Sequence, residues 1–143
     1  LTEVERHKAG PAMEMCARSV ILSAGLVSLM ADDNYNCALA HAVCYGLQHF
    51  EHIERDDLHG DLVAYGALVQ LMLDGQADKA RELRAFLVSL GTPVTLAEMN
   101  VPLDKAALHD ALVEATTGPD MAHIPYPITQ DMVFEAMQRV EAL

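Results

Sequence analysis

Apolar residues recur at helical spacing through most of the chain, and this periodicity constrains the fold more than any other feature of the sequence. From Pro11 to Met30 they follow three- and four-residue steps and form a stripe that runs almost all round, which predicts a largely buried helix. Further helices are predicted from an Asn34 N-cap to near Gly46, over His59–Leu73, Ala77–Leu90 and Leu103–Ala115, and from a Thr129 cap to about Val140. The sequence therefore predicts an all-α bundle of about six helices.

Local signals refine the helix ends. Asp74-Gly75 and Gly91 are predicted to stop two of the helices, and polar residues crowd Gln48–Asp57, which predicts a loop. Thr95 and Glu98 have capping-box spacing. In the amphipathic helix over Ala77–Leu90 the residues predicted to face inward are Leu83, Phe86, Leu87 and Leu90.

The sequence lacks the signals of a nucleotide-binding sheet. A dinucleotide-binding half needs strands and a glycine-rich turn that leads into a helix. The eight glycines of this chain are isolated, and convincing strand patterns are hard to find. We therefore expect that these 143 residues hold no nucleotide by themselves.

Composition excludes several classes of partner and suggests a compartment. With 9 Lys and Arg against 21 Asp and Glu, the formal net charge is −12, so nucleic acid is not an expected partner. The apolar stretch Val20–Ala31 is shorter than the ~20 residues of a membrane span, so no membrane partner is expected. A charged opening and three cysteines, an odd number, indicate no secretory signal and reduced thiols, hence a cytoplasmic location.

Two of the seven histidines stand where an imidazole has a chemical role. His41 lies among small apolar residues in mid-helix, where a ring is costly to bury unless it is hydrogen-bonded or ligated. His59 begins a helix, where the positive end of the helix dipole disfavours imidazolium and leaves a ring nitrogen free to bind a metal. The alternatives are a core histidine bonded to a carbonyl for His41 and an exposed cap residue for His59. If the rings meet, a catalytic metal site would still need a third ligand.

Other arrangements of metal-binding residues are weaker. Cys37, His41 and Cys44 share one helix face and could form a structural zinc site, although buried cysteines commonly pack as apolar residues. The remaining histidines lie in polar or surface contexts and are expected to be solvated; they are His7, His49, His52, His109 and His123, the last beside a proline-rich loop.

Several segments together resemble one protein family. Ala40–Leu47, with sequence AHAVCYGL, and His59–Gly66, with sequence HGDLVAYG, resemble the C-terminal part of glycerol dehydrogenases in the iron-containing alcohol dehydrogenase family. Leu90–Leu96 and His123–Thr129 resemble its later turn and closing loop. The resemblance covers about Pro11–Leu143 and implies the helical C-terminal half of a dehydroquinate-synthase-like fold, with residues 1–143 as a single domain.

The resemblance also implies an activity and its cofactors. Members oxidise a small polyol or related alcohol with NAD, using Zn²⁺ or Fe²⁺ to polarise the hydroxyl. By matching motifs, His41 and His59 would be metal ligands and the catalytic residues of this chain. The third ligand of the family is an upstream Asp, and NAD binds a separate N-terminal α/β domain; both are expected to precede Leu1. Two departures stand out: Cys44 replaces a common imidazole, and Asp61 replaces the usual Glu.

Three hypotheses follow. In the first, the chain is the metal-binding half of a glycerol-dehydrogenase-like oxidoreductase, a C-terminal fragment that is inactive alone and self-associates into a homo-oligomer. In the second, it is a non-catalytic helical interaction module derived from that family. In the third, another polypeptide supplies the missing nucleotide-binding half. Convergence of the His41 and His59 rings would favour the first hypothesis over the second.

Overall fold

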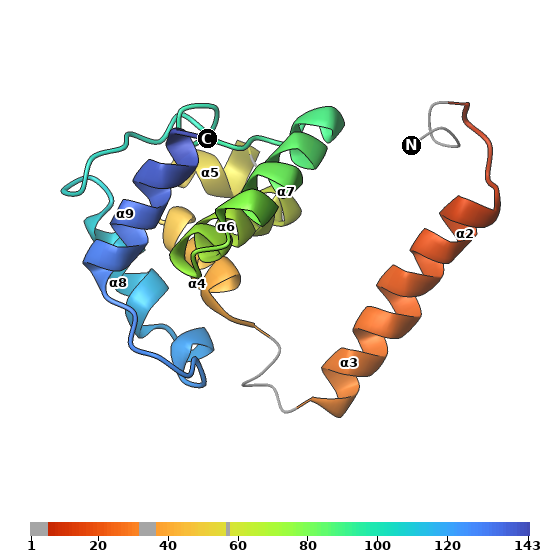
Figure 1. The fold of residues 1–143 in the computed structure, drawn as a ribbon, viewed down its shortest axis with the longest axis horizontal. Coiled ribbons are helices and arrows are strands. Elements are labelled where there is room, and N and C mark those ends of the chain that lie inside the picture. Colours follow the sequence, from red (N-terminus) through yellow and green to blue (C-terminus); the bar gives the residue numbers. More distant parts are fainter. Residues whose placement is uncertain (1–5, 32–36, 57) are drawn as a thin grey trace. The chain divides into compact units, whose positions relative to one another are not determined.

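The protein is helical throughout the part of the chain that its computed structural model describes, which is residues 6–31, 37–56 and 58–143 (Figure 1). No strand occurs among these residues, so the predicted all-α fold is confirmed. In chain order the elements are α2 (Pro11–Arg18), the π-helical turn η1 (Ser19–Ser23), α3 (Ala24–Met30), α4 (Leu39–Leu47), α5 (Glu51–Asp56), α6 (His59–Leu73), α7 (Ala77–Leu90), α8 (His109–Thr117), the 3-10 turn η3 (Pro119–Met121) and α9 (Gln130–Glu141).

The chain divides into two compact units. The first, Leu1–Asn36, is called the N-terminal unit, and the second, Cys37–Leu143, is called the packed unit. The single domain expected over residues 1–143 stays a prediction.

The described helical part of the N-terminal unit runs from Pro11 to Met30 through α2, η1 and α3. The predicted helix is confirmed, but the prediction that it is largely buried is wrong. None of its residues is buried, and Leu29 and Met30 are each 85% exposed. An apolar stripe is buried only when another element covers it, and the described residues of this unit contain no further helix or strand.

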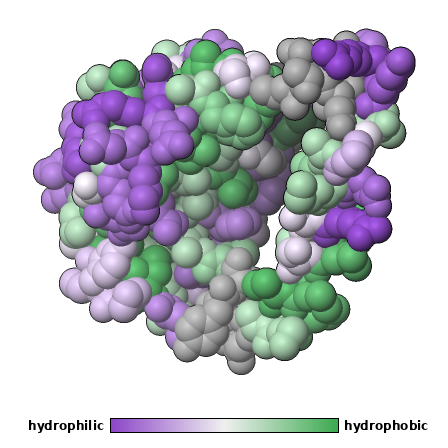
Figure 2. All heavy atoms as spheres, turned by 45° about the vertical axis from the view of Figure 1, so that its right-hand side comes forward, coloured by the Kyte–Doolittle hydropathy of each residue, from purple (hydrophilic) through white to green (hydrophobic). Residues whose placement is uncertain are grey.

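The length of this helix contradicts the expectation that the region is too short to span a membrane. The helix has 20 residues, and by length and composition it is sufficient to cross one. It begins at Pro11, well before Val20, and its charged side chains, Glu14 and Arg18, pair with each other at 2.7 Å. The core helices of soluble proteins meet the same criterion. Figure 2 shows hydrophobic side chains gathered over α3.

Helix α4 is the centre of the packed unit. It packs mainly against α6 and α8, and α6 in turn contacts α7 and α9 (Figure 1). The core between these helices is aliphatic, with one buried tyrosine; its largest fully buried members include Leu47, Leu62, Tyr65, Leu68, Leu112 and Met137. The hydroxyl of Tyr65 donates to Glu141 at 3.5 Å, and the same carboxylate oxygen accepts from the Leu96 N–H at 2.8 Å. This link fastens the end of α9 to α6 and to the loop that follows α7.

The bounds of α6 and α7 agree with the prediction, and a glycine ends each helix as expected. Gly75 and Gly91 have φ angles of 72° and 77°, which only glycine adopts without strain. Beyond them the N–H of Gln76 bonds Leu71 O at 2.8 Å, and the N–H of Thr92 bonds Leu87 O at 3.1 Å. These bonds satisfy carbonyls that the helix itself leaves unpaired.

The side-chain caps predicted from sequence are also confirmed. Thr95 Oγ1 accepts from the Glu98 N–H at 3.2 Å, and the Glu98 carboxylate accepts from the Thr95 N–H at 3.1 Å. Glu98 also accepts from the Val94 N–H at 2.7 Å. At the start of α9, Thr129 Oγ1 accepts from the Met132 N–H at 3.3 Å. Each bond gives a partner to a backbone donor that would otherwise lack one.

Other local predictions were wrong or fall outside the described residues. The polar stretch Gln48–Asp57 is not all loop, because it contains α5. The fifth predicted helix begins at His109 and not at Leu103, since Asp104 accepts from the Ala107 N–H at 2.8 Å and holds a turn there. Two side chains predicted to face inward from α7 are exposed, namely Phe86 and Leu90. The predicted Asn34 cap lies outside the described residues, and α4 begins after Ala38.

Candidate metal centre

The structure brings the two histidines singled out from the sequence side by side. His41 lies in the first turn of α4, and His59 is the first residue of α6. Their ring centroids are 5.9 Å apart, with the ring planes tilted by 47°. Two residues separated by a helix, a loop and a short helix therefore present adjacent imidazoles, although the metal role expected for them stays a prediction.

Close packing between α4 and α6 sets this placement. Gly66 lies against the backbone of Ala40, where an added Cβ would collide with the Ala40 carbonyl oxygen. One turn further along α6, Gln70 Oε1 accepts from the Ala40 N–H at 3.2 Å. The N–H groups of the first turn of a helix lack partners within it, so Gln70 satisfies one of them from the neighbouring helix. The residue next to Ala40 is His41, whose backbone is therefore fixed relative to α6.

His41 is not the carbonyl-bonded core histidine of the alternative interpretation. Its ring is partly buried, and its nitrogens make no hydrogen bond to any part of the chain that the structure describes. His59 is exposed, as the cap-residue alternative required, but its ring is not isolated, because Cys44 lies next to it. Both imidazoles thus combine a fixed backbone with accessible ring atoms.

Cys44 and Tyr45 complete the surroundings of the two rings. The Cys44 Sγ lies 3.5 Å from His59 Nδ1 and 3.9 Å from the His59 carbonyl oxygen. The Tyr45 ring centroid is 6.4 Å from that of His41 and 6.2 Å from that of His59. Sequence reasoning gave Tyr45 no role at the site, although residues four apart share a helix face and Tyr45 follows His41 by four.

Burial and nearby acidic groups raise the pKa values of three side chains near the histidine pair, those of Tyr45, Cys37 and Cys44. Burial, followed by the charges of Cys37, Asp120 and Cys44, raises the pKa of the Tyr45 hydroxyl. Burial, followed by Asp120, raises the pKa of the Cys37 thiol. Burial alone raises the pKa of Cys44 to about 11. At neutral pH all three groups are therefore neutral and can donate a hydrogen bond.

The structural zinc site considered from Cys37, His41 and Cys44 does not form. No group of three His, Cys, Asp or Glu side chains that could hold a metal occurs among the described residues. The reason is geometric, because the three residues span two turns of chain and α4 begins only after Cys37.

The remaining histidines follow the prediction with one exception. His7, His49, His109 and His123 are exposed. His52 is partly buried instead: its Nε2 lies 3.0 Å from the Met99 carbonyl oxygen, and its ring packs 6.0 Å from Phe50. The exception arises because α5 replaces the predicted loop and turns His52 toward the chain after α7.

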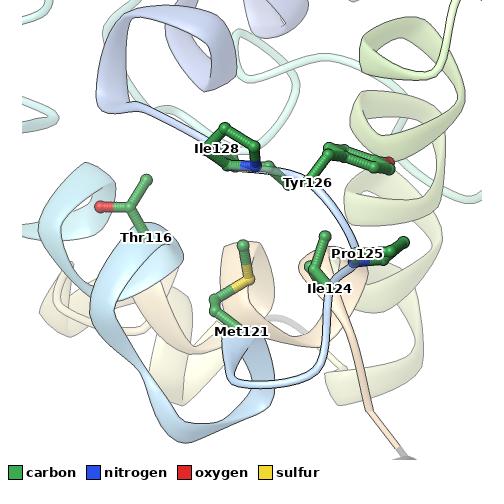
Figure 3. A pocket seen from close by; sticks show the side chains of 7 residues that line it. Thr116, Met121, Ile124, Pro125, Tyr126 and Ile128 are labelled. Carbon is green, nitrogen blue, oxygen red and sulfur yellow. The ribbon is translucent and has the colours of Figure 1, made fainter.

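A separate hollow lies beside the loop between η3 and α9 (Figure 3). Its volume is about 440 Å³, and it is lined by Thr116, Met121, Ile124, Pro125, Tyr126, Pro127 and Ile128. The Tyr126 hydroxyl donates a hydrogen bond to Asp74. This bond is the main cause, and burial the second, of the rise in the pKa of Tyr126 to about 12. No acid or histidine is among the residues that line this hollow.

Known proteins similar to this chain are dehydrogenases and reductases. Hydroxycarboxylate dehydrogenase A of Escherichia coli (strain K12) is 34% identical over 126 residues, which are 87% of this chain and 34% of that protein. The chain belongs to the iron-containing alcohol dehydrogenase family. Glycolaldehyde reductase of Halobacterium salinarum is 32% identical over 83% of this chain and 33% of its own length. Glycerol dehydrogenase of Escherichia coli O6:H1 is 29% identical over 93% of this chain and 36% of its own length.

These similarities confirm the family that the sequence resembled. The chain spans about a third of the length of these relatives. No family model matches the chain.

Proposed function

We propose that this chain provides the helical, metal-binding part of a glycerol-dehydrogenase-like enzyme that oxidises a small polyol or related alcohol with NAD. His41 and His59 are proposed as two ligands of one Zn²⁺ or Fe²⁺ ion. The observation that carries the proposal is the adjacency of the two rings, 5.9 Å apart at the centroids.

The donor set suits such a cation as part of a larger ligand set. Two imidazoles bound tetrahedrally to one Zn²⁺, with nitrogens about 2.0–2.1 Å from the metal, have ring centroids roughly 5 Å apart. The observed separation needs only a small side-chain adjustment to reach that value. A third donor would come from outside the described residues, because these contain no group of three. Bound there, the cation would act as a Lewis acid on a substrate hydroxyl.

The chain's own residues would fix and surround the site. Gly66 and Gln70 hold the first turn of α4 against α6, which keeps the His41 and His59 rings together. The ring of Tyr45 lies near both imidazoles, and its neutral hydroxyl would be available to donate a hydrogen bond to an oxygen of the substrate.

The NAD site is proposed to lie on other sequence. The described residues contain no strand, and the glycines do not form the turn that holds a pyrophosphate. The nucleotide-binding part would be a further domain or another polypeptide. We expect the 143-residue chain alone not to oxidise glycerol with NAD, and turnover by the purified chain would contradict this part of the proposal.

Metal binding tests the role of the histidine pair. The full chain is titrated with Zn²⁺ alone by calorimetry, and His41→Ala and His59→Ala are each expected to weaken binding at least tenfold, because each removes one ligand. His109→Ala is the matched control, since His109 is also an exposed histidine that begins a helix. No binding by the natural chain, or binding unaffected by both substitutions, would overturn the proposal.

The non-catalytic interaction module considered from the sequence is less well supported. It would be favoured by two rings lying far apart and bonded separately to carbonyls. The rings lie together instead, and the His41 ring has no such bond among the described residues.

A further inference from the structure

The sulfur of Cys44 contacts two atoms of His59. Cys44 is not one of the proposed metal ligands, so the proposed function gives this contact no role. Cys44 lies in α4, three residues after His41, and is completely buried with 0% exposure. Its Sγ is 3.5 Å from Nδ1 of the His59 ring and 3.9 Å from the His59 carbonyl oxygen. A thiol has one hydrogen to donate and a sulfur that accepts weakly, so two hydrogen-bonding arrangements are open to it.

In the first arrangement the thiol donates to the His59 carbonyl oxygen, and the sulfur accepts the proton of Nδ1–H. In the second arrangement the thiol donates to an unprotonated Nδ1, and the carbonyl oxygen receives nothing from Cys44. Only in the first arrangement do both Nδ1 and the carbonyl oxygen of His59 form a hydrogen bond with the thiol. A neutral imidazole carries its proton on either nitrogen, and the hydrogen bond made by one nitrogen decides the state of the other.

We propose that Cys44 is a positioning residue that holds His59 in the Nδ1–H tautomer and so leaves Nε2 with the free lone pair. The role is that of the partners which orient metal-binding histidines in proteins, where a carbonyl or carboxylate usually accepts the second ring N–H. As a statement about metal binding the inference rests on the proposed function, whereas the tautomer itself does not depend on a metal.

Ligation by Cys44 itself is the competing possibility, and the structure disfavours it. Cys44 does not join His41 and His59 in a group that could hold a metal. The Cys44 sulfur therefore acts on the ring of His59 and not on the cation.

The tautomer of His59 is the direct test. Long-range ¹H–¹⁵N NMR spectra of the full chain distinguish the two neutral tautomers, and the His59 signals are assigned by their loss in His59→Ala. We expect Nδ1–H in the natural chain, a shift toward Nε2–H in Cys44→Ala, and recovery of Nδ1–H in Cys44→Ser, whose hydroxyl also donates and accepts. Cys16→Ala is the control, because Cys16 is exposed and lies outside the packed unit.

A purely structural role for Cys44 would leave the tautomer unchanged in Cys44→Ala while lowering stability. That result, or Nε2–H in the natural chain, would overturn the proposal. Cys44→Ser keeps the test decisive if Cys44→Ala fails to fold, because the serine chain must still show Nδ1–H.

Zn²⁺ alone then tests the consequence for metal binding. Cys44→Ala is expected to weaken Zn²⁺ binding about 10- to 100-fold, and Cys44→Ser to recover much of it. With Co²⁺ as the probe, a sulfur-to-cobalt charge-transfer band that disappears in Cys44→Ala would show that Cys44 is a ligand and would overturn the positioning role. If the chain binds no Zn²⁺ while His59 shows Nδ1–H, the proposed function fails and the tautomer assignment stands. If Zn²⁺ binds through both histidines while Cys44→Ala changes nothing, only the Cys44 proposal fails.

Discussion

The helix of the N-terminal unit and helix α6 are both rich in apolar residues, yet they have opposite environments. Leu26 in α3 is 55% exposed, whereas Leu68 in α6 is fully buried. Nothing lies within 4 Å of a Cβ placed on Gly25, whereas a Cβ on Gly66 would collide with the backbone of α4. The difference teaches that apolar composition makes a helix fit for burial, but close contact with a neighbouring backbone decides whether it is buried.

The contrast extends to polar contacts. In the N-terminal unit, Glu14 pairs with Arg18 across one turn of a single helix, and both side chains are largely exposed. In the packed unit, Glu141 joins Tyr65 of α6 to the Leu96 backbone, which lies 45 residues away in sequence. Polar contacts between segments far apart in the sequence occur where a core is buried. A polar contact within one helix forms without a buried core.

Shortening a leucine in each helix should give the largest difference. Leu68→Ala is expected to lower the free energy of unfolding by about 2–5 kcal/mol, because it leaves a cavity in a fully buried site. Leu26→Ala is expected to change it by no more than about 0.5 kcal/mol. Urea unfolding followed by circular dichroism measures both. A loss of similar size for Leu26→Ala would show that α3 packs against protein, and the comparison would then fail.

Adding one methyl group at each helical glycine should give the next largest difference. Gly66→Ala is expected to destabilise the chain by about 1–3 kcal/mol, because the new Cβ forces α4 and α6 apart. Gly25→Ala removes a helix-weakening glycine without any contact and is expected to stabilise α3 by about 0.5–1 kcal/mol. Thermal unfolding separates these outcomes by sign. Two stabilising substitutions would show that the α4–α6 contact is not tight.

The smallest expected effect concerns the pH dependence of Glu98. Hydrogen bonds from the Val94 N–H and from Thr95 lower the pKa of its carboxyl below the ordinary value of 4.5, against an opposing effect of burial. The folded pKa is thus below the unfolded one, so the stabilisation is present above the unfolded value and is lost as pH falls through the folded value. Glu98→Gln should remove this acid-range loss and cost about 0.5–1 kcal/mol at pH 7.

Glu14→Gln provides the matching measurement in the N-terminal unit. Its exposed pair with Arg18 contributes little, so its substitution should leave the free energy of unfolding and its pH dependence unchanged within error. Unfolding curves between pH 3 and about pH 7 compare the two substitutions, in the range where carboxyl groups titrate. An equal pH effect from Glu14→Gln would remove this part of the contrast.

Much of the helical architecture could be predicted because its signals are local. The ends of α6 and α7 follow from a glycine after each helix, and the Thr95–Glu98 and Thr129 caps follow from residue spacing. The loop predicted over Gln48–Asp57 failed because polar residues also form helices when a few apolar ones, here Ile53, reach the core. The prediction that Phe86 faces inward was wrong, because periodicity shows which face of a helix is apolar and not how far the neighbouring elements extend over that face.

The candidate site was only partly predictable. His41 and His59 could be chosen from their sequence surroundings, and their separation along the chain allowed the two rings to meet without requiring it. The position of Tyr45 beside His41 could also have been predicted from helix geometry, because Tyr45 follows His41 by one turn. The contact between Cys44 and His59 was not, because it depends on how closely α4 approaches the first residue of α6.

The sequence by itself determined which segments are helical, where most of them end, and which two imidazoles deserve notice, because these properties depend on residues within one or two turns of each other. The tertiary structure decided that Pro11–Met30 is exposed while one face of α6 is buried, and that His59 meets both His41 and the Cys44 thiol. Those outcomes depend on contacts between residues far apart in the chain, above all the approach of Gly66 to Ala40, and helical periodicity does not encode such contacts.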